Sequence, residues 1–392
     1  MSAPRRVCVV TGSRAEFDLL RWLMADVRED PALELQVVAT GMHLSPEFGR
    51  TVTHLEEAGF PPDDIVESLL SADTPSAVAK SVGLGLIGFA DVFRRLDPDI
   101  VVILGDRFES FAAAQAAAIA RHVIAHVHGG EAAEGAVDEA IRHAITKMAH
   151  YHFVATDEYR RRVIQLGEDP DRVFDFGAPG LDRLRRTSLL SHAAVAEFVA
   201  LSGDGPLVVA TYHPVTLSDR DQVADLDEVL AALAGLGSAR IVITLANADA
   251  AGRALNDRLR GFESEHPDRV RLFAALGQER YLSLLAAAAV VVGNSSSGII
   301  EAPSVGTPTV NVGPRQRGRV RGASVIDCDA ERSAVQGAIE RAFSADFLDG
   351  AFAEPSPYDR GGASHRICAE LARVPLEGVV MKRFYDLPAR GS

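Results

Sequence analysis

The 392-residue sequence has only three cysteines, and Cys8, Cys328 and Cys368 stand far apart. An odd number without paired spacing excludes a disulfide framework and the zinc and redox motifs that need closely spaced cysteines. We therefore expect these residues to be buried free thiols.

The sequence also lacks long apolar runs, and its positively charged residues are fewer than its negatively charged ones. The longest uninterrupted apolar run, Leu284–Val292, is far shorter than the roughly 20 residues that cross a bilayer. Met1–Thr11 lacks the apolar core of a signal peptide. The net charge of −14 repels nucleic acid and anionic membranes unless basic residues gather locally. The sequence thus predicts a cytoplasmic protein that binds neither nucleic acid nor a membrane.

Strand-length apolar runs alternate with helix-length segments along the whole chain, as in parallel strands joined by crossover helices. Each run is apolar throughout, which is expected of strands covered by helices on both faces. The predicted strands are Arg6–Val10, Leu35–Thr40, Ile100–Leu104, Val123–Val127, His152–Ala155, Leu207–Ala210, Ile241–Leu245, Val270–Phe273, Val290–Val292 and Thr309–Val312. Helices are predicted over Thr74–Leu96 and Phe108–Arg121.

A composition break near Thr187–His192 separates two similar halves, and no repeat of 20 to 50 residues indicates a solenoid. We predict an α/β protein with two Rossmann-like domains that face a cleft. The domains would cover residues 1–187 and 188–364, and a helical segment at 365–392 would cross back to the first domain. Ligands of open parallel sheets bind beyond the carboxyl ends of the strands, so this cleft is the expected site.

Charged residues follow the first and third predicted strands. The turn Gly12–Asp18 contains Arg14 and offers free backbone N–H groups to an anion, although an ordinary strand-to-helix turn is the alternative. It lacks the three-glycine fingerprint of nicotinamide cofactors. The block Gly105–Glu109 places Asp106 and Arg107 at the same edge; here simple helix capping by Asp106 is the alternative.

A histidine- and carboxylate-rich segment follows the next strand. His126, His128 and Glu131 precede Asp138 by one short loop. Carboxylates gathered beyond strand ends are suited to acid–base chemistry on a sugar. A metal held by the two histidines is a second possibility, since residues two apart on a strand share one face, but the spacing demands no metal.

The second half has its own candidate anion site. Gly293–Glu301 leaves a strand and enters a helix, so that hydroxyls and amides converge at the helix start, and an unliganded serine-rich cap is the alternative. Four arginines, at positions 315, 317, 319 and 321, supply local positive charge. The candidates for binding an anionic substrate in this half are His213, Asn247, Ser295, Ser296, Ser297, Glu301, Arg315 and Arg319, with Arg14 and Arg107 in the first half. Taken singly, His213 and Asn247 also fit ordinary turn positions.

Six motifs in order resemble the hydrolysing UDP-N-acetylglucosamine 2-epimerases of bacterial sialic and legionaminic acid biosynthesis. They are Gly12–Glu16, Gly105–Glu109, His126–Glu131, Arg142–Lys147, Gly293–Glu301 and Arg315–Arg319. The resemblance implies the two-domain GT-B fold, no cofactor and no metal, and a homodimer or homotetramer. It also implies anti elimination of UDP to a glycal, followed by hydration to a free mannosamine-type sugar.

The resemblance further assigns roles to residues. Asp106, Glu131 and Asp138 match the acid–base positions, and Arg14, His213, Ser295, Ser296, Glu301 and Arg319 match the nucleotide site. His128 stands where one branch of the family has a catalytic glutamate, so either His128 or Glu131 takes that role. Ala15, in place of a proline, and the lack of lysine before Lys80 favour the hydrolysing branch. A non-hydrolysing epimerase and a GT-B glycosyltransferase remain the alternatives.

Overall fold

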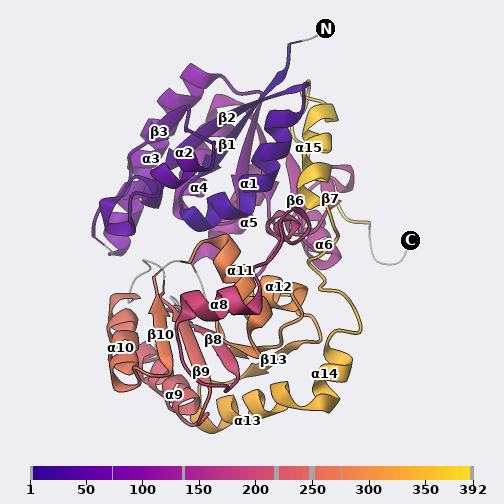
Figure 1. Ribbon diagram of the computed structural model, residues 1–392. Coiled ribbons are helices and arrows are strands. Elements are labelled where there is room, and N and C mark those ends of the chain that lie inside the picture. Colours follow the sequence, from indigo (N-terminus) through magenta and orange to yellow (C-terminus); the bar gives the residue numbers. More distant parts are fainter. Residues whose placement is uncertain are drawn as a thin grey trace. The chain divides into compact units, whose positions relative to one another are not determined.

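The computed structural model describes residues 3–72, 74–134, 137–215, 220–246, 252–274 and 276–388. The chain forms two compact units (Figure 1). The first comprises Met1–Glu131, Asp138–Arg183 and Arg360–Ser392, and the second comprises Ala132–Val137 and Leu184–Asp359. Each unit is built around its own parallel sheet, which confirms the predicted α/β class.

The described residues of the first unit form a seven-stranded sheet in the order β3-β2-β1-β4-β5-β6-β7. Its strands are β1 (Arg5–Thr11), β2 (Leu33–Thr40), β3 (Asp64–Val66), β4 (Ile100–Leu104), β5 (Val123–Val127), β6 (Tyr151–Val154) and β7 (Val173–Asp175). Its helices of at least one α-turn are α1 (Arg14–Glu29), α2 (Val52–Glu57), α3 (Pro75–Leu96), α4 (Phe108–Ala120), α5 (Asp138–Met148), α6 (Asp157–Gln165), α7 (Arg183–Arg186, which runs on past the unit boundary) and α15 (Ala363–Arg373). Short 3₁₀ turns η1 (Gly41–His43), η2 (Pro46–Phe48), η3 (Pro170–Arg172) and η4 (Pro179–Asp182) complete it.

Helices cover both faces of this sheet because successive strand residues point to opposite sides. On one face, Val9 of β1 belongs to an apolar cluster with Phe17 of α1 and Leu371 of α15. On the other face, Cys8 of β1 belongs to a cluster with Phe89 of α3. The C-terminal helix α15 is therefore part of the core of the first unit.

The second unit repeats this plan with a six-stranded sheet in the order β10-β9-β8-β11-β12-β13 over its described residues. Its strands are β8 (Leu207–Thr211), β9 (Arg240–Thr244), β10 (Val270–Phe273), β11 (Val290–Gly293), β12 (Thr309–Val312) and β13 (Val325–Cys328). Its helices are α8 (His192–Val199), α9 (Gln222–Ala234), α10 (Gly252–Glu265), α11 (Gln278–Ala287), α12 (Ser297–Ser304), α13 (Arg332–Phe343) and α14 (Ala345–Ala351). Val292 packs with Leu230 of α9 on one face, and Val291 packs with Leu284 of α11 on the other.

All ten predicted strands are confirmed, but β3, β7 and β13 escaped sequence analysis. Each lies at an edge of its sheet, and each contains exposed or half-buried positions. A strand of three or four residues with one solvated face gives no continuous apolar run.

Helix α3 is long and apolar enough to cross a membrane by length and composition. Its apolar runs are short in the sequence because Lys80 and several glycines interrupt them, so no membrane-spanning segment was predicted there. One face of α3 is buried, and Phe89 and Phe93 there pack with alanines of α4. Only 33% of its most apolar stretch is buried, however, and Ile87 is 68% exposed on the other face.

The cysteines are free, as predicted, but only two of them are buried. Cys8 and Cys368 lie in the core, and burial raises the pKa of the Cys8 thiol. Cys328 is half-buried at the end of β13, so the prediction was wrong for this residue.

Candidate functional site

In each sheet the strand order reverses between two central strands. These are β1 and β4 in the first unit, and β8 and β11 in the second. At such a reversal the loops leaving the carboxyl ends diverge and open a crevice for a ligand. The predicted site residues of each unit follow these strands or their neighbours.

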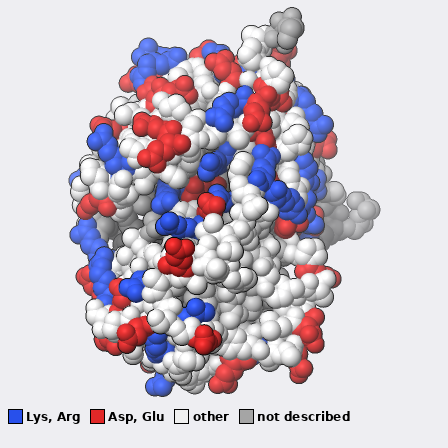
Figure 2. Space-filling model, in the orientation of Figure 1, with Lys and Arg blue, Asp and Glu red and all other residues white. Residues whose placement is uncertain are grey.

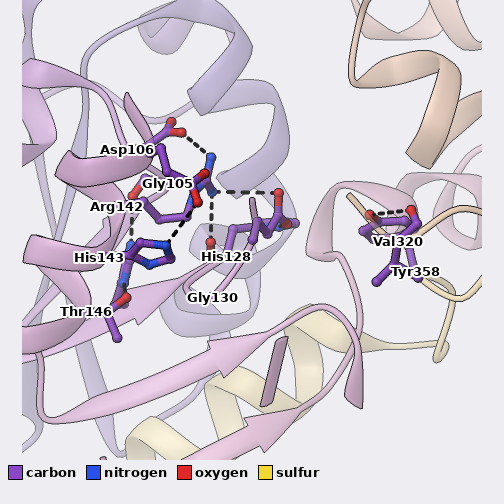
Figure 3. A network of polar contacts seen from close by, with 12 residues as sticks. Gly105, Asp106, His128, Gly130, Arg142, His143, Thr146, Val320 and Tyr358 are labelled. Carbon is purple, nitrogen blue, oxygen red and sulfur yellow. Dashed lines mark hydrogen bonds and ion pairs between the residues drawn. The ribbon is translucent and has the colours of Figure 1, made fainter. Parts of the chain in front are cut away.

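Arg142 of α5 joins the acid–base candidates of the first unit (Figure 3). Its guanidinium donates to the carboxylate of Asp106 and, over 2.9 Å, to the carbonyl of His128. The same group lies 3.7 Å from Glu131 Oε2. Arg142 and Glu131 are both buried. One arginine thus holds the loop after β4 and the loop after β5 together.

His128 and Glu131 form a close pair within the loop after β5. His128 Nδ1 lies 2.5 Å from Glu131 Oε1. A carboxylate accepts this hydrogen bond, so Nδ1 carries the hydrogen and Nε2 is the ring nitrogen that is left to exchange a proton. Nε2 is buried and has no hydrogen-bond partner among the described residues.

The backbone of His128 is strained. Its φ of +63° lies in the left-handed region, which non-glycine residues seldom adopt. Such strain costs about 1–3 kcal/mol and persists where surrounding contacts impose it, often at functional sites. Here the bond from Arg142 to the His128 carbonyl supplies such a contact.

His126 positions the loop that carries Asp106. Its Nε2 donates to the carbonyl of Gly105 over 2.7 Å, and its Nδ1 lies 3.1 Å from Thr146 Oγ1 on α5. Burial lowers the pKa of His126 to about 3. Both ring nitrogens are occupied by protein groups, so the alternative of a metal shared with His128 is wrong for this ring. No group of His, Cys, Asp and Glu suited to a metal occurs in the part of the chain that the structure describes.

Asp138 is the first residue of α5, four positions before Arg142. Residues four apart lie on the same face of a helix. Asp138 is half-buried, and next to it Glu139 pairs with His143 over 3.2 Å. The structure therefore places Asp138 on the helix face that carries Arg142.

The turn after β1 is already filled by its own side chains. Glu16 accepts from the Gly12 N–H over 2.7 Å, while Ser13 caps α1. Burial raises the pKa of Glu16 to about 7, against the charge of Arg107. Arg14 lies 4.0 Å from Asp18. The ordinary capped turn therefore accounts for Glu16, and a substrate role for Arg14 stays a prediction.

Arg107 is held by its neighbour. Its guanidinium pairs with the buried carboxylate of Glu109 over 3.2 Å. Glu109 also packs so closely on Gly41, where φ is +56°, that a Cβ there would lie 2.6 Å from Glu109 Oε1. The contribution of Arg107 to substrate binding stays a prediction.

Asn294 organises the candidate nucleotide site of the second unit. Its side chain accepts from the His213 N–H over 2.7 Å and donates to the His213 carbonyl over 2.8 Å. Its own carbonyl accepts from Arg315 and Gln316. Asn294 thus ties the end of β8 to the arginine-rich loop after β12. Burial and the charge of Arg315 lower the pKa of His213 to about 3.

The serines lie at the start of α12 as predicted. Ser295 Oγ accepts weakly from the Ser297 N–H over 3.4 Å, and Ser297 Oγ accepts from the Tyr281 hydroxyl over 2.8 Å. Ser296 is the residue that precedes the helix, and Glu301 lies one turn inside it. Burial raises the pKa of Tyr281 to about 12, and the charge of Glu301 adds to the rise.

The arginine cluster after β12 divides by role. Arg321 donates to the carbonyls of Gln316 and Arg319 and pairs with Asp327, so it stabilises the loop. The buried Tyr358 holds the same loop, since its hydroxyl donates to the Val320 carbonyl (Figure 3).

Figure 2 shows Lys and Arg interspersed with Asp and Glu on the viewed face. Asn247 lies outside the described residues.

Sequence analysis missed the residues that connect the candidates. Arg142, Asn294 and Gln316 were seen only as parts of motifs, and His126 was considered only as a metal ligand. The partners of Arg142 and Asn294 lie between 11 and 81 positions away in sequence, and no spacing rule predicts such pairs. Tyr281 gave no signal at all.

Comparison with known proteins matches a family model described as UDP-N-acetylglucosamine 2-epimerase over residues 25–372. The hydrolysing GDP/UDP-N,N'-diacetylbacillosamine 2-epimerase of Campylobacter jejuni is 37% identical over 384 residues, covering 98% of this chain and 99% of that protein. The hydrolysing UDP-N,N'-diacetylbacillosamine 2-epimerase of Legionella pneumophila is 34% identical, with 97% and 98% covered. The structure of the Neisseria meningitidis UDP-GlcNAc 2-epimerase bound to UDP-GlcNAc has a TM-score of 0.80 at 16% identity, covering 93% of this chain and 99% of that one.

Proposed function

The chain belongs to the UDP-N-acetylglucosamine 2-epimerase family and is a hydrolysing UDP-sugar 2-epimerase, and we propose that it converts a UDP-linked 2-acetamido sugar and water into UDP and the free C2 epimer. The observation that carries this proposal is the network in which Arg142 joins Asp106, Glu131 and His128. Such a network supplies several proton-transfer groups at one strand edge. A protein that only binds nucleotide sugars has no need of it.

The first step is an elimination. A base in the first unit takes the proton from C2, the C1–O bond breaks, and UDP leaves with the bonding electrons, so that a C1–C2 double bond forms in the sugar. Nε2 of His128 has the lone pair and the burial that such a base requires, and Glu131 stabilises the imidazolium that forms. Asp106 and Asp138 are the further acid–base groups at this edge.

The second step is hydration. A water adds its oxygen to C1, and one of the acid–base groups donates a proton to C2 from the face opposite the one that lost its proton, so the configuration at C2 is inverted. A carboxylate activates the water by accepting its proton, as in other sugar hydrolyses. The atoms balance, because one water is consumed for each UDP and free sugar produced.

We assign nucleotide binding to the second unit. Ser295, Ser296 and Ser297 offer hydroxyls and amides at the start of α12, where the helix dipole favours an anion. Arg315 and Arg319, from the loop after β12, neutralise the charge that develops on the leaving diphosphate. Glu301 is suited to accept from ribose hydroxyls, and His213 is held neutral beside Arg315.

The substrate proposed first is UDP-N,N'-diacetylbacillosamine, a 6-deoxy sugar with two acetamido groups. The support is the near full-length identity to relatives named for that sugar. UDP-N-acetylglucosamine is the second compound to test, since the family is described by it.

The test is product analysis in heavy water with both UDP-sugars and no acceptor. We expect equal amounts of UDP and a free sugar that is inverted and carries one deuterium at C2. Release of UDP without deuterium at C2 would refute the elimination. A product still linked to UDP would indicate a non-hydrolysing epimerase, and turnover only with an added acceptor would indicate a glycosyltransferase.

A further inference from the structure

The segment that follows α15 returns along the first unit and contacts the end of α5 through Lys382. The Lys382 ammonium donates to the carbonyls of Lys147 over 2.8 Å and Ala149 over 2.6 Å. It also lies 2.5 Å from Glu168 Oε2. Val380 and Met381 are 39% and 84% exposed, so from Val380 onward the segment is attached through particular side chains and not through general burial.

Glu168 is the buried anion to which this attachment is made. Its carboxylate also pairs with Lys147 over 2.6 Å and with His152 over 3.0 Å. Burial alone would raise the pKa of Glu168, but His152, Lys147 and Lys382 together lower it to about 2. Glu168 is therefore ionised at neutral pH and holds the Lys382 ammonium in place.

Phe384 provides a second attachment two residues further on. Its ring covers Gly167 so closely that a Cβ at this glycine, whose φ is +86°, would lie 2.3 Å from the ring. The Tyr385 N–H donates to the Gly167 carbonyl over 2.9 Å. The Lys147 ammonium also lies 4.9 Å from the centre of the Phe384 ring.

The carbonyls that Lys382 contacts lie at the C-terminal end of α5. The last four carbonyls of a helix have no partner within it, and this end of the helix dipole is negative. A cation that donates to these carbonyls satisfies and stabilises the helix end. The same helix presents Thr146 to His126 and Arg142 to Asp106 and His128.

We infer that Lys382 is a positioning residue for the epimerase reaction, which caps α5 and so fixes Arg142 against Asp106 and the His128 loop. The inference rests on the proposed function, because it assigns the reaction's acid–base groups to that network. Misplacement of reacting groups by about 1 Å costs on the order of 10²-fold in rate, so a small shift of α5 suffices.

The test compares Lys382→Met with Arg383→Met, which removes a neighbouring exposed positive charge. For Lys382→Met we expect kcat to fall about 10-fold or more while KM stays within about twofold, as for groups that act in the transition state. We expect Lys382→Arg to recover part of the loss and Arg383→Met to match the wild type. Equal kcat in Lys382→Met and Arg383→Met would overturn the inference.

Hydrogen–deuterium exchange of α5 gives a readout that is independent of turnover. In Lys382→Met the amides of residues 138–149 should exchange faster than in Arg383→Met, and unchanged exchange would overturn the inference. If Lys382→Met does not fold, Phe384→Ala takes its place as the test, because it changes a largely exposed ring. We expect it to have a smaller effect of the same kind. A wild-type protein that turns over no UDP-sugar would refute the proposed function instead.

Discussion

Asp106 is bound by the protein on one side only. Its carboxylate pairs with buried Arg142, while its side chain keeps 21% exposure. It is thus held by the protein on one side and open on the other. A group so placed can exchange a proton with a bound sugar without losing its orientation.

Asp106→Asn should retain UDP affinity and lose turnover. The change removes negative charge at the reacting sugar and leaves the second unit intact, so we expect kcat to fall about 10²–10⁴-fold, with the Kd of UDP within about twofold. Steady-state kinetics and calorimetry measure the two quantities. Asp171→Asn, at an exposed carboxylate, is the matched control, and a parallel loss of UDP binding in Asp106→Asn would show that Asp106 is structural.

Glu16→Gln should change the pH dependence of stability. Burial raises the pKa of Glu16 to about 7, so the folded state binds the proton more tightly than the unfolded state. The stability that protonated Glu16 contributes is fully present below pH 4.5 and is lost as the pH rises to about 7. Relative to the wild type, the free energy of unfolding of Glu16→Gln should therefore increase by up to about 3 kcal/mol between pH 5 and pH 8. Urea titrations at each pH test this, and a constant difference would contradict it.

Among the elements, the junction of β11 and α12 depends on Gly293. Its φ is +138°, and an added Cβ would lie 1.9 Å from the Thr211 carbonyl oxygen of β8. The close approach of the two strand ends lets Asn294 reach the backbone of His213. The candidate nucleotide site therefore requires glycine at this position.

Gly293→Ala should destabilise the protein by about 3 kcal/mol or more, because backbone strain and overlap with the neighbouring strand add. It should also weaken UDP binding through displacement of Asn294. Gly337→Ala is the control, since Gly337 lies exposed within α13 with open space around it. Alanine there should stabilise by about 0.5–1 kcal/mol. Thermal unfolding with and without UDP measures both, and equal effects of the two changes would refute the expectation.

Elements were predicted from sequence far better than their connections. The interior strands, such as Ile100–Leu104, are buried along their whole length and so give clear apolar runs. The strand-to-helix turns that carry Asp106 and Ser295 follow directly from those runs. The pairing of Arg142 with Asp106 depends on how α5 packs beside β4 and β5, which is a property of the assembled layers. The roles of Glu16 and Arg107 were obscured for a different, local reason, since each is paired with a group that the turn itself brings close.

At the scale of the whole molecule, both units bury neutral histidines. Burial lowers the pKa of several of these rings, to about 4 for His43 and His150, to about 3 for His126 and His213, and below the ordinary value for His152. The unfolded chain binds protons at these rings near pH 6.5, whereas the folded chain does not. The stability that these neutral rings contribute is therefore fully present above pH 6.5 and is lost as the pH falls toward 3.

The protein should accordingly be acid-labile. Each of the four rings with a pKa of about 3 or 4 contributes a loss of about 2 kcal/mol at pH 5, and together they approach the usual 5–15 kcal/mol stability of a domain. The midpoint of urea unfolding should fall steeply between pH 6.5 and pH 5. His126→Asn should reduce this slope, and His192→Asn, at an exposed ring, should not. A flat profile in the wild type would contradict the expectation.

The first unit is completed by residues that follow the second unit in the chain. Its core includes Ile367, Leu371 and Val379, and the carboxylate of Asp182 accepts from the first N–H groups of α15. Most of the second unit is one uninterrupted stretch, Leu184–Asp359. During synthesis the second unit can thus complete its sheet while the first still lacks a covering helix. The nascent sheet of the first unit must therefore wait, with one face incompletely covered, until α15 has been synthesised.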